Sequence, residues 1–234
     1  MDTLPQLLLL GLAAGIAIPI GGWIAKFEHI HPAWLENELR HFVIAFGGGA
    51  LISAVALVLI PEGVKDMPIW LVAVLVSVGA IAFMALDIIL ARINSPSSQL
   101  AAMMADFLPE ALALGAFIAD GETGYLLTFL ITIQNLPEGF NAFRELRTKI
   151  SAKRILTTFA LLALIGPLST SAGYFFLADF KMVLKGIMLF ASGGILYLVF
   201  QDIAPQSQIK KHWLPATGAV AGFLLGLVGH LMSK

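Results

Sequence analysis

The stretch PIWLVAVLVSVGAIAFMALDIILAR (Pro68–Arg92) has one charged residue, Asp87, between its two ends. A helix needs about 20 mostly apolar residues to cross the hydrocarbon core of a bilayer. Seven more stretches meet this requirement, so the sequence predicts an all-α polytopic membrane protein. We expect its eight transmembrane helices at Leu4–Trp23, Phe42–Val64, Pro68–Arg92, Leu100–Ala119, Gly124–Arg144, Ile155–Leu177, Met182–Ala204 and Leu214–Met232.

The composition supports a membrane protein. Hydrophobic residues make up 59% of the 234 residues and charged residues 12%, which is about half the charge of a soluble domain. Cysteine is absent, which excludes disulfides and thiolate metal ligands. The net charge of −1 argues against a nucleic-acid partner. The predicted loops are short, so we expect residues 1–234 to form a single transmembrane transporter domain. No lysine or arginine precedes the first apolar run, so we expect no cleaved signal peptide.

Lysine and arginine predict the orientation, because cytoplasmic loops of membrane proteins carry an excess of both. The loop RELRTKISAKR (Arg144–Arg154) alone holds five of the fourteen basic residues. We expect ten on the cytoplasmic side: Lys26, Arg40, Arg92, Arg144, Arg147, Lys149, Lys153, Arg154, Lys210 and Lys211. Both termini then face outward, and we expect a plasma-membrane location of the bacterial inner-membrane kind.

The second and seventh predicted helices share a pattern. FGGGALISAVALVLIPEG (Phe46–Gly63) aligns without gaps with FASGGILYLVFQDIAPQS (Phe190–Ser207), so that Pro61 matches Pro205. These two helices would cross the membrane in opposite directions, which is typical of transporters built from inverted repeats. The alternative is chance similarity between two helices rich in glycine, alanine and leucine.

Polar residues interrupt the fourth and fifth predicted helices. The stretches ADFLPEALAL (Ala105–Leu114) and TIQNLPEGFNAF (Thr132–Phe143) each contain Leu-Pro-Glu. Pro109 and Pro137 each remove a backbone hydrogen bond, which favours a bend beside the glutamate. Such a polar break in lipid is tolerated only where protein or water satisfies the freed backbone groups.

Each stretch also carries a second polar residue one turn earlier. Asp106 precedes Glu110 by four residues and Gln134 precedes Glu138 by four, so each pair shares a helix face. Charged residues at bilayer depth are costly and mark substrate or ion pathways. No lysine or arginine lies between Arg92 and Arg144, so the neutralising charge must be a bound cation or protons. Oxygen ligands suit a divalent metal; the alternative is a set of protonated carboxyls hydrogen-bonded between helices.

The paired motifs resemble the metal-binding motifs of the Zrt-/Irt-like (ZIP) divalent-metal transporters, which read H-N-x-P-E-G on the fourth helix and H- or Q-x-x-P-E-G on the fifth. The resemblance implies a 3+2+3 arrangement of eight helices and import of a metal ion by alternating access. Carried over one position at a time, it implies a metal site formed by Asp106, Glu110, Gln134 and Glu138.

The second metal site of two-metal ZIP members is not matched. Its positions fall on Phe107, Asn135 and Gly166, and of these only the asparagine can bind a metal. The resemblance therefore implies one metal ion per chain. The histidine-rich loop after the third helix is also missing, and RINSPSSQ stands there. Without histidine, the preference shifts from zinc toward manganese or iron(II), with cobalt and cadmium also candidates.

Three carboxylates and a dication sum to a charge of −1, so a proton on one carboxylate would neutralise the site. We therefore expect transport to depend on pH. Other polar residues have two interpretations each. Asp87, Gln201 and Asp202 could line an access route, but the last two could instead mark a solvated helix end. Glu62 either attracts cations or is simply exposed. The loop histidines are either a loose metal acceptor or ordinary loop residues: His29, His31 and His41.

Two functional alternatives remain beside metal import. The same residues could handle protons or an organic cation in a transporter-like protein that has lost metal transport. An intramembrane hydrolase is the other class, but neither H-E-x-x-H nor a Gly-x-Gly-Asp run occurs, so we expect no enzyme. The expected partners are the metal-ion substrate and the lipid bilayer, and a homodimer is compatible with the sequence.

Overall fold

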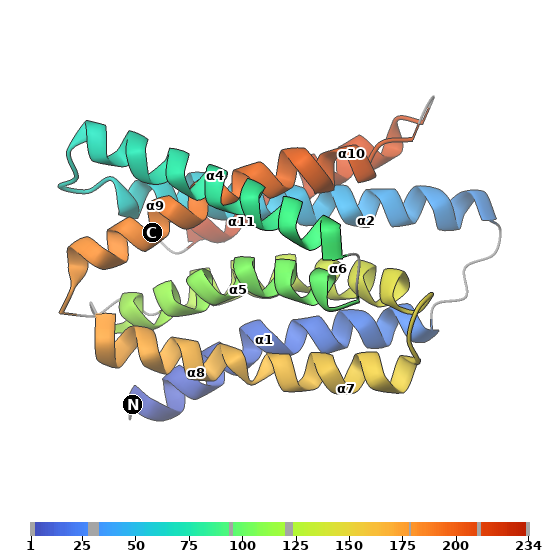
Figure 1. The fold of residues 1–234 in the computed structure, drawn as a ribbon, viewed down its shortest axis with the longest axis horizontal. Coiled ribbons are helices and arrows are strands. Elements are labelled where there is room, and N and C mark those ends of the chain that lie inside the picture. Colours follow the sequence, from blue (N-terminus) through green and yellow to red (C-terminus); the bar gives the residue numbers. More distant parts are fainter. Residues whose placement is uncertain are drawn as a thin grey trace.

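The computed structural model describes residues 3–27, 33–93, 96–119, 124–177, 179–209 and 212–232. These residues are predominantly helical and include no β-strand (Figure 1). The all-α prediction is therefore confirmed. The helices are α1 (Thr3–Phe27), α2 (Ala33–Ala54), η1 (Val55–Leu59), α3 (Ile60–Gly63), α4 (Ile69–Ile93), α5 (Pro96–Ala119), α6 (Tyr125–Leu146), α7 (Ala152–Ala163), α8 (Ile165–Ala172), η2 (Gly173–Leu177), α9 (Lys181–Leu198), η3 (Val199–Ile203), α10 (Ala204–Gln206) and α11 (Leu214–Met232), where η denotes a π-helical turn.

Six helical segments in the described part of the chain are long and apolar enough to cross a membrane, which indicates a multi-pass membrane protein. These segments are Leu4–Phe27, Glu38–Gly63, Ile69–Ile93, Ala152–Leu177, Lys181–Gln206 and Leu214–Met232. The two helices with the Leu-Pro-Glu motifs, α5 and α6, are not among the six. Both contain polar residues in mid-helix, and both run without interruption through their prolines, Pro109 and Pro137.

The helices run side by side as a bundle (Figure 1). In this view α2, α4, α9 and α11 form one group, α1, α7 and α8 form another, and α5 and α6 lie between them. The most extensive contacts join α1 to α6, α2 to α11 and α4 to α9, and α5 packs on α8 and η2. The central helices are therefore enclosed by helices from both parts of the chain.

The two ends of the bundle differ in charge. We call the end where α1 begins and α11 ends the terminal end, and the opposite end the basic end (Figure 1). The described lysines and arginines of the basic end are Lys26, Arg40, Arg92, Arg144, Arg147, Lys149, Lys153 and Arg154, and those of the terminal end are Lys65, Lys181 and Lys185. The basic residues predicted to share one face thus lie at one end of the bundle, as far as they are described.

The predicted similarity of the second and seventh helices extends to their backbone. The π turn Val55–Leu59 comes just before Pro61, and the π turn Val199–Ile203 comes just before Pro205. Equivalent residue numbers differ by 144 in both cases. A proline within a helix lacks an N–H and clashes with the preceding turn, and a wider π turn relieves that clash. Figure 1 shows α2 and α9 running in opposite directions.

The same relation appears in how closely these helices pack on their neighbours. A Cβ added to any of four glycines would lie within 2.0 Å of a carbonyl oxygen on the facing helix, so only glycine fits. The glycine–carbonyl pairs are Gly49–Ala219 and Gly222–Phe46 between α2 and α11, and Gly193–Val76 and Gly79–Phe190 between α9 and α4. The α2–α11 contact and the α4–α9 contact therefore have the same form. Their corresponding residues in α2 and α9 again differ by 144 in number.

A second contact is also built twice, around the central helices. Here a Cβ on any of the four glycines would lie within 2.2 Å of a facing carbonyl oxygen. The pairs are Gly139–Ile18 and Gly21–Leu136 between α6 and α1, and Gly115–Thr170 and Gly173–Leu112 where α5 meets α8 and η2. Residues of α1 and their equivalents in α8 and η2 differ by 152 in number, as Gly21 and Gly173 do. Residues of α5 and their equivalents in α6 differ by 24, as Gly115 and Gly139 do. The helix contacts of the two halves therefore correspond position by position, and we call this correspondence the two-fold relation.

Substitution of a glycine at these contacts tests whether the close approach supports the fold. We expect Gly193→Ala to lower the free energy of unfolding by about 1–3 kcal/mol, because neither backbone can yield without breaking its helix. Gly186→Ala, also in α9, is the control, since its Cβ would meet only the Leu75 side chain at 3.7 Å. There we expect a gain of about 0.5–1 kcal/mol from helix propensity. Equal thermal unfolding of the two variants in detergent would contradict the proposed packing.

Candidate cation site

A carboxylate and an amide meet in the middle of the bundle. Gln134 Nε2 of α6 donates a hydrogen bond to Glu110 Oε2 of α5. Glu110 is 0% exposed and Gln134 is 2% exposed. About nine residues of each helix separate the pair from the terminal end, or about 14 Å at 1.5 Å per residue. A carboxylate buried at this depth requires polar partners, and the Gln134 amide is one of them.

The hydrogen bond leaves the other atom of the amide available. Gln134 Oε1 is buried and accepts no hydrogen bond from the described residues. This assignment of the amide holds Nε2 on the carboxylate and keeps an oxygen for a second partner. A carbonyl-type oxygen is a ligand that hard cations accept. The pair can therefore present amide and carboxylate oxygens to one cation.

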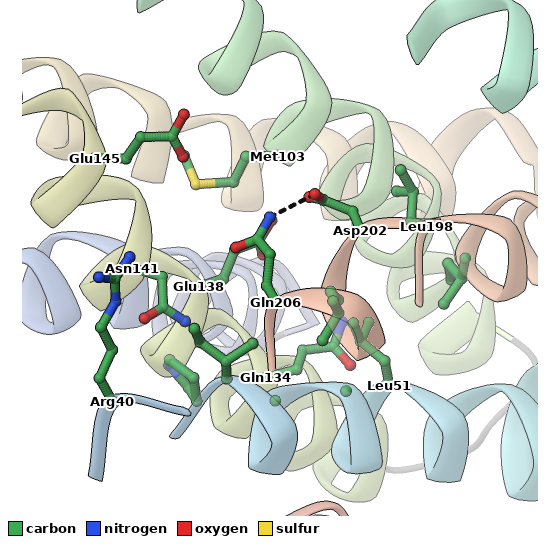
Figure 2. A pocket seen from close by; sticks show the side chains of 16 residues that line it. Arg40, Leu51, Met103, Gln134, Glu138, Asn141, Glu145, Leu198, Asp202 and Gln206 are labelled. Atoms are coloured by element: carbon green, nitrogen blue, oxygen red, sulfur yellow. Dashed lines mark hydrogen bonds between the residues drawn. The ribbon is translucent and has the colours of Figure 1, made fainter. Parts of the chain in front are cut away.

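Gln134 also lines a pocket that reaches the basic end. Four polar residues of α6 lie along it at helical spacing, Gln134, Glu138, Asn141 and Glu145. Arg40 of α2 and Met103 of α5 line other parts of the wall (Figure 2). The chain thus provides a polar route from the buried pair to the end of the bundle where α6 finishes.

The far wall of this pocket is also polar. Asp202 of η3 and Gln206 of α10 line it, and Gln206 Nε2 donates a hydrogen bond to Asp202 Oδ1 at 2.5 Å (Figure 2). Asn141 Oδ1 is buried and accepts no hydrogen bond within the part of the chain described. Glu138, Glu145 and Asp202 give the pocket three carboxylates against the single guanidinium of Arg40. This balance favours a cation over an anion.

The four residues of the predicted metal site are placed as follows. Glu110 and Gln134 are in direct contact, and Glu138 lines the pocket together with Gln134. Asp106 lies in α5 one turn before Glu110, and its side chain is outside the described part of the chain. Among the side chains that are described, no three of His, Cys, Asp or Glu come close enough to hold a metal ion. The complete four-ligand site stays a prediction.

The two-fold relation and the alignment of the two Leu-Pro-Glu motifs make different positions of α5 and α6 equivalent. Aligning the two Leu-Pro-Glu motifs matches Glu110 with Glu138, whose numbers differ by 28. The helix contacts relate α5 to α6 by 24, which makes Glu110 equivalent to Gln134 and Glu138 equivalent to Leu114. The hydrogen bond therefore joins two equivalent positions of α5 and α6. Leu114 is 0% exposed, so a buried apolar residue stands on the terminal side at the position equivalent to Glu138.

An aromatic ring lies beside Gly166, one of the positions that the ZIP resemblance assigns to a second metal site. Phe107 is 1% exposed, and its Cζ lies 3.1 Å from where a Cβ of Gly166 would be. That Cβ would also lie 2.2 Å from the carbonyl oxygen of Gly11. Asn135, the third position, donates from Nδ2 to the Ala14 carbonyl at 3.0 Å. A glutamate at position 166 would have no room for its side chain.

Sequence reasoning missed four lining residues: Arg40, Met103, Glu145 and Gln206. The spacing of Glu145 from Glu138, seven residues, would have revealed it as part of the same helix face. Arg40 and His41 were expected in a loop, which is wrong because α2 begins at Ala33, well before its apolar part. A helix can continue into the aqueous phase without apolar residues, so hydropathy alone places its start too late. His29 and His31 lie outside the described residues.

The other polar residues that the sequence suggested for an access route lie in different places. Asp202 lines the pocket, whereas Gln201 lines a shallow groove between α4 and α9. Asp87 accepts a hydrogen bond from the Tyr197 hydroxyl at 3.0 Å and lines a small apolar pocket elsewhere. Glu62, at the terminal end, pairs with Lys65.

The sequence matches no known protein-family profile and no curated protein sequence. The resemblance to ZIP transporters therefore depends on the sequence motifs alone.

A double-mutant cycle tests the buried pair. We expect Gln134→Leu to lower the free energy of unfolding by about 1–3 kcal/mol, because the Glu110 carboxylate loses a buried donor. Combining it with Glu110→Leu should recover most of this loss, since neither polar group then remains buried. Thermal unfolding in detergent measures all four proteins. Losses that simply add in the double variant would contradict a direct interaction.

Proposed function

We propose that the protein is a divergent ZIP-type carrier that imports a divalent transition-metal ion through one intramembrane site by alternating access. The observation that carries this proposal is the buried Glu110–Gln134 pair at the head of a carboxylate-lined pocket. The pair supplies oxygen ligands at mid-bundle, and Glu138 and Asn141 continue them toward the basic end. Such a path gives a cation successive polar partners through an apolar bundle.

We infer that all eight helices cross the membrane, including α5 and α6. Their 24 and 22 residues correspond to about 36 and 33 Å, which is enough for a hydrocarbon core of about 30 Å. Enclosure by the outer helices lets their polar residues avoid lipid. With the basic end in the cytoplasm, both termini face outward from a plasma membrane. The chain is then an inverted repeat in a 3+2+3 arrangement, which the doubled glycine contacts support.

In this proposal the structure corresponds to an inward-facing state. The pocket leads from Gln134 to Arg40 and Glu145 at the basic end. Toward the terminal end, the positions equivalent to Glu138 and Asp106 are Leu114 and Leu130, and both are 0% exposed. The route is thus polar on the cytoplasmic side and sealed by apolar residues on the outer side.

One metal ion per chain follows from the region around Phe107. Its ring takes the space beside Gly166, which removes the second site. The remaining ligands, Asp106, Glu110, Gln134 and Glu138, are all oxygen donors, which favours manganese or iron(II) while zinc, cobalt and cadmium remain candidates. Because ligating carboxylates must be deprotonated, binding weakens as the pH falls.

The second candidate function is transport of protons or an organic cation. It is favoured by the lack of any group of three His, Cys, Asp or Glu side chains within metal-binding distance among those described. Protonated carboxyls on Glu110 and Glu138 would then replace the metal charge. The experiments below distinguish the two functions.

Metal binding is tested by thermal shift on the purified protein. We expect Mn²⁺, Fe²⁺, Co²⁺, Zn²⁺ or Cd²⁺ to raise the unfolding temperature, by the equivalent of about 2.7 kcal/mol at a hundred times the dissociation constant. Glu138→Ala should abolish the shift, whereas Glu62→Gln, at the terminal end, should keep it. Metal analysis of the saturated protein should give one ion per chain. Absence of any shift would favour the proton or organic-cation alternative.

Transport itself is tested with proteoliposomes loaded with no metal and supplied with radiolabelled ions at two pH values. We expect uptake that depends on Glu138 and Gln134 and that requires a higher metal concentration at the lower pH, since protons compete for the carboxylates. Proton movement without metal uptake would instead support the alternative. Empty liposomes and Glu62→Gln proteoliposomes serve as controls.

A further inference from the structure

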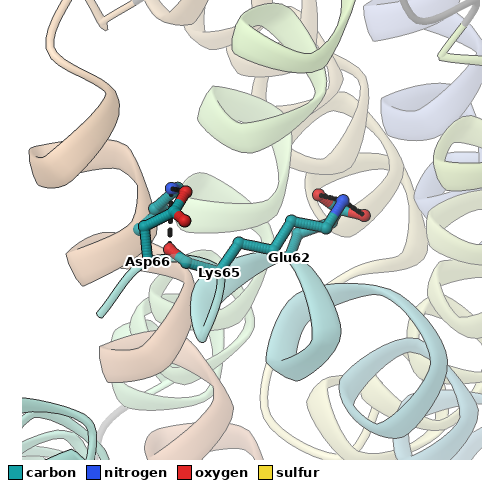
Figure 3. A network of polar contacts seen from close by, with 4 residues as sticks. Glu62, Lys65 and Asp66 are labelled. Atoms are coloured by element: carbon teal, nitrogen blue, oxygen red, sulfur yellow. Dashed lines mark hydrogen bonds and ion pairs between the residues drawn. The ribbon is translucent and has the colours of Figure 1, made fainter. Parts of the chain in front are cut away.

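A lysine joins two helices at the terminal end of the bundle. Lys185 Nζ of α9 donates hydrogen bonds to the Lys65 carbonyl oxygen at 2.7 Å and to Asp66 Oδ2 at 3.1 Å (Figure 3). Both acceptors lie in the turn after α3, where Asp66 adopts a positive φ of 59°. The Lys185 side chain is 18% exposed, while that of Asp66 is 90% exposed. The bond to the carbonyl is therefore the better shielded of the two.

Lys185 lies where the two-fold relation allows the two ends to be compared. The α3–α9 contact at the terminal end is equivalent to the α10–α2 contact at the basic end, with numbers that differ by 144. At the basic end the pocket is lined by Arg40 and Ile44 of α2. At the terminal end the equivalent of the exposed Arg40 is Leu184, which is 5% exposed, while Met188 is 3% exposed against 5% for its equivalent Ile44. We call the terminal end of this helix pair the closed end, because a buried leucine stands there at the position where the pocket-lining arginine of the basic end is exposed.

The closed end is also tightly packed. A Cβ on Gly63 of α3 would lie 2.8 Å from Leu189 Cγ of α9. Leu59, equivalent to the pocket-lining Ile203, is 1% exposed. Leu59 and Leu184 therefore fill the positions where an equivalent outer pocket would open. Lys185 connects the helices just beyond this apolar seal.

We propose that Lys185 is a latch that holds the terminal end closed while the pocket is open at the basic end. When the latch releases, α3 separates from α9 and a path equivalent to the pocket opens past Leu59 and Leu184 to Glu110. The inference rests on the proposed alternating access. The latch acts on the balance between the two conformations and contacts no residue of the candidate metal site.

The neighbouring ion pair provides a matched control. Lys65 Nζ binds Glu62 Oε1 and Oε2 at 2.6 and 2.5 Å, within one helical turn. Only the backbone carbonyl of Lys65 takes part in the bridge to α9. Lys65→Met and Lys185→Met therefore remove the same charge from the same end, but only the second breaks the connection between helices.

The chain contains no cysteine, so single-cysteine reporters can follow the conformation without a transport assay. Leu59→Cys reports on the terminal end and Ile203→Cys, at the equivalent position, on the basic end. Each is combined with Lys185→Met or Lys65→Met in the purified full chain, and the rate of modification by a water-soluble thiol reagent is measured. We expect Lys185→Met to raise the rate at Leu59→Cys roughly three- to tenfold and to lower it at Ile203→Cys. Lys65→Met should change neither rate more than about twofold.

Several outcomes would overturn the latch. These are unchanged rates in Lys185→Met, equal effects of the two lysine substitutions, or a rise at both reporters, which would indicate loss of packing. Asp66→Asn, which keeps the carbonyl bond, should give a smaller rise at Leu59→Cys in the same direction. If proteoliposomes take up no metal but the thiol-modification rates change as expected, the proposed metal import is contradicted and the latch is supported. If metal uptake occurs but the thiol-modification rates do not change, only the latch is contradicted.

Discussion

The fold depends on the burial of the Glu110 carboxylate in the middle of an apolar bundle. A polar group at that depth must be satisfied by protein, because neither lipid nor bulk water reaches it. The Gln134 amide does so from the neighbouring helix, which requires α5 and α6 to meet at one register. The other polar residues that α6 contributes to the pocket follow from that register, since Glu138, Asn141 and Glu145 share a helix face with Gln134.

The register is maintained by contacts between glycines and backbone carbonyls on the outer helices. Gly139 brings α6 against α1, and Gly115 brings α5 against α8, at separations that leave no room for a Cβ. Because these contacts are repeated, Glu110 and Gln134 occupy equivalent positions on α5 and α6. The side chains do not obey that symmetry. Glu138 faces a polar pocket, whereas its equivalent, Leu114, is fully buried, and this difference gives the bundle its direction.

Prolines act differently at different places in this chain. Pro61 and Pro205 follow π turns, while α5 and α6 continue as α-helices through Pro109 and Pro137. Two of the three described π turns therefore lie in the second and seventh predicted helices, and the third, Gly173–Leu177, lies in the sixth. A π turn leaves backbone groups less regularly bonded than an α turn does. Irregular turns in these helices fit a part of the bundle that has to change its contacts.

Local pattern determined the helices, the uneven distribution of lysine and arginine, and the polar positions on α5 and α6, because each depends only on residues close in sequence. The similarity of Phe46–Gly63 to Phe190–Ser207 was likewise visible before the doubled contacts confirmed that the two segments are built alike. Only the tertiary structure decided that Glu110 is hydrogen-bonded to Gln134 and that these two residues, rather than Glu110 and Glu138, occupy equivalent positions. The motifs differ by 28 residues but the packing relates the helices by 24, since the register between two helices is set by the distant segments that each packs against. For the same reason Arg40 and Gln206, far apart in the chain, could be assigned to one pocket only once α2 and α10 were placed together.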